Sequence, residues 1–214
     1  PLSTLYWVGY ELLNLAMPQW RYSGGTPNVL GQVLFGFVAF ATVIPIIMEC
    51  FWLDAGNTGI PLPVARFAAK RRILFVLAGV LALSLPIYSP FFWINQAMWV
   101  GPGLILLPFV NPDQEAPNFR FWRGIIFGSL AGGLLWELIN YWSHTRWEYL
   151  IQINQPHLFE MPVLGYFGFI PFGFSIVVLY AWYSRLSARV VPSLALYVVA
   201  MAGQYLVTVT YARN

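Results

Sequence analysis

Long apolar stretches with few charges dominate this sequence of 214 residues. Residues 29–53 and 161–183 are the longest, and a helix needs about 20 such residues to cross the hydrocarbon core of a bilayer. Only 9% of the residues are charged, against roughly 25% in soluble globular domains, so most of the surface must face lipid. The sequence therefore predicts an all-α, polytopic transmembrane helical bundle.

Seven stretches are candidate membrane spans within a single domain that covers residues 1–214. They are residues 2–17, 29–53, 73–88, 98–110, 124–142, 161–183 and 190–211. The first is short, and because the chain begins at Pro1 rather than Met, we expect upstream residues to be missing. The fourth is also short and contains Pro102 and Pro108, which interrupt helices.

The basic residues indicate how these spans are oriented. Eight of the eleven lie in three loops that a seven-span chain places on one side: Arg66, Lys70, Arg71, Arg72, Arg120, Arg123, Arg185 and Arg189. Only Arg21, Arg146 and Arg213 fall on the other side. The positive-inside rule then places the N-terminus and the basic loops in the cytoplasm. The run 66–72 also suits contact with anionic lipid headgroups.

The two halves of the sequence resemble each other. Residues 11–14 (Glu-Leu-Leu-Asn) correspond to 137–140 (Glu-Leu-Ile-Asn), and each is followed by a Trp-x-Tyr motif, at 20–22 and 147–149. Each half then continues with Phe-Gly-Phe, at 35–37 and 167–169. Four spans separate the matching spans, so we expect a parallel duplication. Its halves are residues 1–96 and 124–214, joined by a linker, 97–123, that holds the short fourth span.

Glu11 and Glu137 lie in or near apolar spans, where an ionisable side chain is costly and therefore a candidate functional residue. Each has an asparagine three residues later, Asn14 and Asn140, on the same helix face. One interpretation is a polar site for proton transfer or ligand anchoring. The other, which we favour, is that each carboxylate bonds an aromatic N–H or a nearby arginine, Arg21 or Arg146, and locks the helices.

Residues 157–162 (His-Leu-Phe-Glu-Met-Pro) form a second candidate region. Pro162 suits the first turn of a helix, and Glu160 suits the positive end of that helix. A sharper interpretation adds His144, His157, Glu148 and Glu137 as ligands of a transition metal. We predict no metal site, because the carboxylate–histidine helix pairs of di-iron bundles are absent. Haem ligation by either histidine is equally disfavoured, since both lie in a loop.

Gly124, Gly128 and Gly132 recur every four residues in the predicted fifth span. Small residues at this spacing let helix backbones approach closely. They predict that this span is central, which places Glu137 inside the bundle rather than facing lipid.

Several segments resemble a family of uncharacterised bacterial polytopic inner-membrane proteins. They are 135–142, 147–149 and 159–166 in the second half, and 20–22 and 40–45 in the first. The resemblance implies a membrane protein but no activity. The chain is less similar to the fused or heterodimeric lycopene cyclases, whose spans are also duplicated and which carry a Pro-x-Glu-Glu/Asp motif. Here the order is Glu160-Met161-Pro162 and the second acid is missing.

Three functions remain open. We expect a non-catalytic accessory or scaffold subunit of a larger membrane complex that packs lipid, a carotenoid or another isoprenoid pigment. The alternative is an enzyme that isomerises or cyclises an isoprenoid or other lipid, with Glu137 and Glu160 as proton donors and Glu11 assisting. A transporter is the third. Nucleic acid is not an expected partner, since the net charge is only +3.

Overall fold

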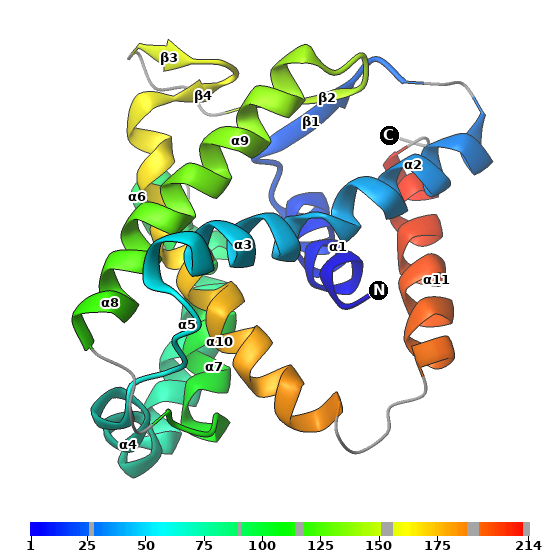
Figure 1. The fold of residues 1–214 in the computed structure, drawn as a ribbon. Coiled ribbons are helices and arrows are strands. Elements are labelled where there is room, and N and C mark those ends of the chain that lie inside the picture. The colour runs from blue at the N-terminus through cyan, green and yellow to red at the C-terminus, as the bar shows by residue number, and fades with distance from the viewer. Residues whose placement is uncertain (26–27, 90, 114–117, 151–155, 188–192, 212–214) are drawn as a thin grey trace. The chain divides into compact units, whose positions relative to one another are not determined.

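The computed structural model describes residues 1–25, 28–89, 91–113, 118–150, 156–187 and 193–211, and most of them are helical (Figure 1). The predicted all-α class is correct, with two short two-stranded sheets in segments that the sequence analysis treated as loops. The chain divides into two compact units. Unit 1 comprises residues 1–46, 135–163 and 191–214, and unit 2 comprises residues 47–134 and 164–190. Arg189, Arg213 and the predicted span start at Val190 lie outside the described residues.

Three helices are long and apolar enough to cross a membrane: Val29–Ala55, Asn118–Trp142 and Val163–Ser184. A fourth span is added if Pro63–Lys70 and Arg72–Tyr88, which meet at 89°, count as one broken span. The chain therefore has the helices of a membrane protein. The predicted number of seven spans is not confirmed, since α1 (Leu2–Ala16) and the apolar stretch Ala195–Tyr211 are shorter than the length such a span requires.

In unit 1, α1 packs against α2 (Val29–Ala41) and α11 (Ser193–Tyr211), which also contact each other (Figure 1). Asn28 caps the N-terminus of α2, since its Oδ1 accepts from the Leu30 N–H at 3.0 Å. The unit also contains the strands β1 (Trp20–Ser23), β2 (Arg146–Tyr149), β3 (His157–Leu158) and β4 (Met161–Pro162). Strand β1 pairs antiparallel with β2, and β3 pairs antiparallel with β4.

A serine from α1 occupies the break between α2 and α3 (Val43–Ala55). Pro45 cannot donate a backbone hydrogen bond, which weakens the helix at this point. The Ser3 hydroxyl donates to the Phe40 carbonyl at 2.5 Å and accepts from the Ile44 N–H at 3.0 Å. These two backbone groups are four residues apart and would bond each other in a regular helix. Ser3 thus satisfies both ends of an interrupted helical hydrogen bond.

Unit 2 contains an antiparallel helical hairpin. Its first arm is α5 (Arg72–Tyr88), which follows α4 (Leu62–Lys70), and α7 (Gly101–Leu106) packs against α5 in the returning arm (Figure 1). The backbones are close, since a Cβ on Gly79 would lie 2.7 Å from the Gly101 carbonyl oxygen. The segments before and after the hairpin lie close together, because the Asp113 N–H donates to the Ile60 carbonyl at 2.8 Å.

The predicted fourth span, residues 98–110, is not one helix. It consists of η1 (Gln96–Trp99), α7 and η2 (Leu107–Phe109), preceded by α6 (Phe92–Asn95). Pro102 removes one backbone donor, and the Ser175 hydroxyl, from α10 (Phe169–Ser187), takes the place of another helical bond. It donates to the Trp99 carbonyl at 2.7 Å and accepts from the Gly103 N–H at 3.0 Å. Ser175 therefore repeats in unit 2 the arrangement of Ser3 in unit 1.

The remaining elements of the chain are α8 (Asn118–Arg123), the π-helical turn η3 (Gly124–Gly128), α9 (Ser129–Trp142) and the 3-10 helix η4 (Val163–Gly168). In unit 2 the glycines of η3 lie against α3. A Cβ on Gly124 would lie 2.6 Å from the Ala55 Cβ, and one on Gly128 would lie 2.6 Å from the Phe51 Cα. Gly132 is buried. These backbones meet at a distance that a side chain at either glycine of η3 would increase.

Candidate functional site

The Glu11 carboxylate is fully buried in unit 1 and receives four hydrogen bonds. Its Oε1 accepts from the indole N–H of Trp7 at 2.6 Å and of Trp20 at 3.3 Å, and from the Tyr22 hydroxyl. Its Oε2 accepts from the Tyr211 hydroxyl at 2.9 Å. The donors come from α1, β1 and α11, so this carboxylate joins three elements.

The Glu137 carboxylate is also fully buried, but it has fewer partners. Its Oε1 accepts from the Tyr149 hydroxyl at 2.6 Å and the Trp147 indole N–H at 3.3 Å. Its Oε2 is buried and has no hydrogen-bond partner among the described residues, and the same is true of the indole nitrogen of neighbouring Trp136. Trp136 stacks on Trp147, with ring centroids 5.4 Å apart. The Oε2 of Glu137 is therefore available as an acceptor, whereas the Oε2 of Glu11 already accepts from Tyr211.

Asn14 and Asn140 hold the two Trp-x-Tyr motifs in equivalent ways. Asn14 donates to the Trp20 carbonyl at 2.9 Å and accepts from the Trp20 N–H at 3.1 Å. Asn140 donates to the Trp147 carbonyl at 2.9 Å and accepts from the Trp147 N–H at 2.9 Å. In each case one amide side chain satisfies both backbone groups of a tryptophan, which orients the strand that follows the helix.

The two Trp-x-Tyr motifs form the β1–β2 ribbon. Trp20 lies opposite Tyr149, and Tyr22 lies opposite Trp147. Because side chains alternate along a strand, these four aromatic residues share one face of the ribbon, which is the face that bonds the two carboxylates. The residues between them, Arg21 and Glu148, share the other face. The ribbon is thus aromatic on the side of the buried acids and charged on the opposite side.

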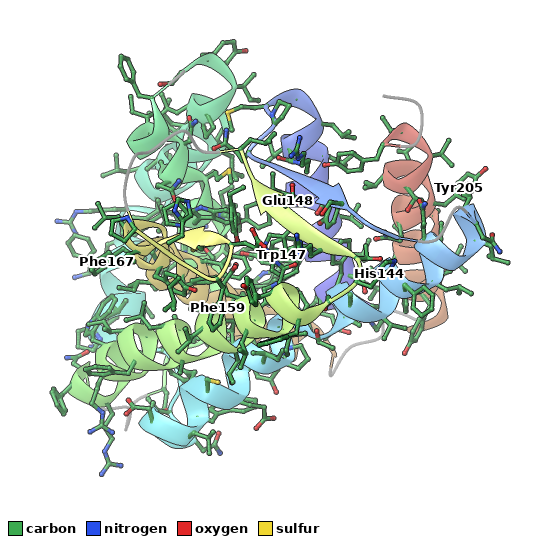
Figure 2. The ribbon with its side chains drawn as sticks, turned by 90° about the horizontal axis from the view of Figure 1, so that it is seen from above. His144, Trp147, Glu148, Phe159, Phe167 and Tyr205 are labelled. Carbon is green, nitrogen blue, oxygen red and sulfur yellow. The ribbon has the colours of Figure 1, made fainter. Side chains whose placement is uncertain are left out.

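Glu148 organises the charged face of the ribbon (Figure 2). Its carboxylate accepts from the Ser23 hydroxyl at 2.7 Å, and it forms ion pairs with Arg21 at 3.0 Å and Arg146 at 3.8 Å. The hydrogen bonds from Ser23 and Arg21 lower the pKa of Glu148 below its ordinary value. On the aromatic face, burial and then the charge of Glu11 raise the pKa of Tyr22 far above its ordinary value, so Tyr22 remains a donor.

The second predicted region, around Glu160, is a small hairpin and not the start of a helix. His157 pairs with Pro162 across β3 and β4, and the 3-10 helix η4 begins only at Val163. The turn includes Phe159, which adopts a left-handed backbone conformation with φ of 57°. Glu160 lies 3.6 Å from the Arg146 guanidinium. Glu160 is therefore an ion-pair partner of the ribbon, and it lies three residues before the helical segment Val163–Ser184.

The two histidines are exposed at the surface of unit 1. His144 precedes β2 (Figure 2), and His157 lies on β3. Within the part of the chain that the structure describes, no three His, Cys, Asp or Glu side chains are grouped so as to hold a metal ion. The partners of Glu148 are arginines and a serine.

Unit 2 contains a different kind of site, an apolar groove of about 860 Å³. It lies between α4, α5, α7, α8, η3 and α10, and Asn118 is the only strongly polar residue among the fourteen described residues that line it. Large side chains dominate its wall, among them Phe67, Phe75, Leu104, Trp122, Ile126 and Phe174. Such a surface suits an alkyl or polyene chain, because it offers contact area without hydrogen-bonding groups.

A smaller cavity of unit 2, about 440 Å³, has a mixed lining. It includes Asn57, Thr58, Asn111, Asp113 and Tyr180. Asp113 closes one side, where its carboxylate accepts from the Gly59 N–H at 3.1 Å. This cavity lies beside the point where the hairpin ends meet.

The sequence indicated both buried acids and their asparagines, but three of the six hydrogen-bond donors to the acids, the tyrosine hydroxyls, were not expected. An aromatic N–H or an arginine was expected at each acid; the structure supplies the indoles together with the hydroxyls of Tyr22, Tyr149 and Tyr211. Arg21 and Arg146 bond Glu148 instead. The Trp-x-Tyr motif itself signalled two of the tyrosines, since alternate strand residues share a face. Comparisons with protein-family models, with curated proteins and with solved structures each find no match for this chain.

Proposed function

We propose that this chain is a non-catalytic subunit of a bacterial inner-membrane complex that holds a lipid or isoprenoid chain in an apolar groove. The observation that carries the proposal is the groove of unit 2, about 860 Å³ in volume, with a single strongly polar lining residue among the described ones. A general acid or base acting on a molecule in this groove would need an ionisable group in its wall. The fourteen described lining residues include none.

The buried acids support a structural role in this proposal. Four donors from three elements saturate the Glu11 carboxylate, so its charge-assisted hydrogen bonds hold α1, β1 and α11 together. Through Tyr149 and Trp147, Glu137 ties β2 to α9. On this interpretation the two acids hold the helices in place, and the aromatic face of the ribbon supplies hydrogen-bond donors to both of them.

The proposal includes seven spans, with the N-terminus and the basic loops in the cytoplasm. The contact between Ile60 and Asp113 supports this topology, because it places the start and the end of the α5–α7 hairpin on the same side of the membrane. The ion pair between Arg123 and Asp54, at 2.9 Å, likewise links two predicted cytoplasmic segments. In a Cys50→Ala background, we expect Lys70→Cys and His144→Cys to react with a membrane-impermeant thiol reagent from opposite sides. Labelling from the same side would contradict the topology.

A parallel duplication is also part of the proposal. Trp20 and Trp147 have matching places in the ribbon, and a twofold rotation perpendicular to it exchanges β1 with β2. The matched bonds of Asn14 and Asn140 support the same relation. The resemblance to uncharacterised inner-membrane proteins remains part of this proposal, since the segments that carry it include both Trp-x-Tyr motifs.

The groove can be tested directly with a tagged chain expressed in a bacterium. After extraction in a mild detergent, mass spectrometry identifies the proteins and apolar molecules that copurify. We expect an apolar-chain molecule and partner subunits in fixed ratio to the chain. Ile126→Trp, which fills the groove, should reduce the bound molecule severalfold. Phe127→Trp is the matched control, because Phe127 is the next residue, 59% exposed and outside the groove lining. An equal amount bound to both variants would refute the proposal.

One observation favours a second candidate function, an enzyme that isomerises an isoprenoid. The unpartnered Oε2 of Glu137 is an acceptor position at which a proton can reside. Glu137 would donate this proton to a double bond and regain one when the isomerised double bond forms. We then expect Glu137→Gln to abolish turnover of a supplied polyene while Glu148→Gln retains it. Unchanged turnover in Glu137→Gln would rule this candidate out.

A further inference from the structure

We propose that the groove of unit 2 binds an anionic phospholipid, with an acyl chain along the apolar wall and the phosphate on the basic residues that follow α4. This inference rests on the proposed function and names the ligand class. A groove that does not distinguish zwitterionic from anionic lipid and a groove that binds neither are the competing outcomes of the test below.

Helix α4 contributes to the groove with one face and carries positive charge on the rest. Pro63, Val64 and Phe67 line the groove. Arg66 and Lys70 lie on the same helix and are exposed. Since α4 meets the apolar helix α5 at 89°, it runs across the direction of a membrane-crossing α5. An amphipathic helix in this orientation lies in the plane of the headgroups.

A direct contact joins the charge to the groove. The Arg71 guanidinium carbon lies 4.2 Å from the centroid of the Phe67 ring, and Phe67 is part of the groove wall. Arg71 is therefore held at the edge of the apolar surface, where a lipid changes from acyl chain to phosphate. An arginine is suited to this position, because its guanidinium stacks on an aromatic ring and can still donate to phosphate oxygens.

Helix α8 contributes a polar group to the groove wall and carries an exposed cation on another face. Asn118 and Trp122 of α8 line the groove, and Arg120 lies between them in the sequence and is exposed. The other arginine of this helix, Arg123, is already neutralised, since it bonds the Asp54 carboxylate at 2.9 Å. The polar contribution of α8 to the groove wall is therefore Asn118, and its uncompensated cation is Arg120.

The charges at this rim are not compensated within the described structure. None of the described carboxylates forms an ion pair with Arg66, Lys70, Arg71, Arg72 or Arg120, whereas Arg21, Arg123 and Arg146 each have one. Five cations beside an apolar groove match a ligand with an anionic head and an apolar tail. Clusters of this size next to a membrane span are typical of anionic-lipid contacts.

The test uses the full chain, purified and delipidated in a mild detergent, and native mass spectrometry with two added lipids. Phosphatidylglycerol and phosphatidylcholine with the same acyl chains differ only in the headgroup. We expect phosphatidylglycerol to be retained about 25-fold more than phosphatidylcholine, because Lys70 and Arg71 each contribute about fivefold. In Arg71→Gln the preference should fall about fivefold, as expected for one basic residue near a phosphate. In Lys70→Gln/Arg71→Gln it should disappear.

Two controls separate the possible failures, and each variant is first checked for an unchanged elution profile and thermal midpoint. Arg21→Gln removes one positive charge from β1 of unit 1 and should leave the preference intact. Ile126→Trp fills the groove and should reduce retention of both lipids. Equal retention of the two lipids, lost in Ile126→Trp, would overturn the anionic ligand and leave the groove function standing. If Ile126→Trp retained both lipids as well as the parent protein does, the anionic ligand and the groove function would both be overturned. If Arg21→Gln lost the preference as fully as Arg71→Gln, the preference would depend only on net charge, and binding at this groove would be refuted.

Discussion

Trp20 and Tyr149 are direct partners across the β1–β2 ribbon, yet they bond different buried carboxylates, Glu11 and Glu137. The other aromatic pair of the ribbon follows the same rule. Tyr22 lies opposite Trp147, and Tyr22 bonds Glu11 while Trp147 bonds Glu137. Each acid thus receives an indole and a hydroxyl from a single strand. The ribbon couples the two acids mechanically, because displacing one strand breaks its backbone pairing with the strand that holds the other acid.

We predict that removal of Glu11 destabilises the protein more than removal of Glu137. Glu11→Ala removes the acceptor of four hydrogen bonds, whereas Glu137→Ala removes the acceptor of two, and the Trp147 indole can still donate to the Tyr149 hydroxyl at 3.0 Å. A lost buried hydrogen bond costs about 1–3 kcal/mol, so Glu11→Ala, which loses two more, should lower the free energy of unfolding by about 2–6 kcal/mol more. Thermal unfolding of both variants in detergent measures the difference. A lower midpoint for Glu137→Ala than for Glu11→Ala would contradict the prediction.

We predict that the ribbon weakens at acidic pH through Glu148. The hydrogen bonds of Ser23 and Arg21 lower its pKa below the ordinary value of 4.5, so the folded state prefers the charged form. The stabilisation is therefore complete above pH 4.5 and is lost as the pH falls through the lowered pKa of the folded state. The thermal midpoint should fall more steeply below pH 4.5 in the parent protein than in Glu148→Gln. Parallel curves for the two proteins would show that Glu148 makes no such contribution.

We predict equal roles for Ser3 and Ser175. Each hydroxyl bridges a backbone carbonyl and the N–H four residues later, so Ser3→Ala and Ser175→Ala each remove two hydrogen bonds to backbone groups. The expected loss is about 1–3 kcal/mol for each. Ser84→Ala is the control, because its exposed hydroxyl bonds only the Leu81 carbonyl of its own helix. A midpoint in either buried-serine variant as high as in Ser84→Ala would mean that the helices close the gap themselves.

The sequence could predict the helices and the buried acids because both depend on local signals. An apolar run long enough for a span is visible without knowledge of its neighbours, and so is a glutamate placed inside it. The Trp-x-Tyr motifs could be found but not paired, since a four-residue strand has too little alternation to specify a partner about 125 residues away. Tyr211 reaches Glu11 across a separation of 200 residues, and Ser175 reaches Gly103 across 72. These contacts depend on tertiary packing, for which one sequence gives no pattern.

Two glycine substitutions in contrasting surroundings, Gly128→Ala and Gly9→Ala, test the helix contact in unit 2. In Gly128→Ala the new Cβ would lie 2.6 Å from the Phe51 Cα, a backbone atom that cannot rotate away, so the helices must separate. Overpacking of this kind costs about 1–3 kcal/mol. Gly9→Ala meets no atom within 4 Å and lies within α1, so it should stabilise that helix by about 0.5–1 kcal/mol. Thermal midpoints that move in opposite directions would support the close contact of η3 with α3. If Gly128→Ala were as stable as Gly9→Ala, a Cβ at residue 128 would have to lie further than 2.6 Å from the Phe51 Cα, and the close contact would be refuted.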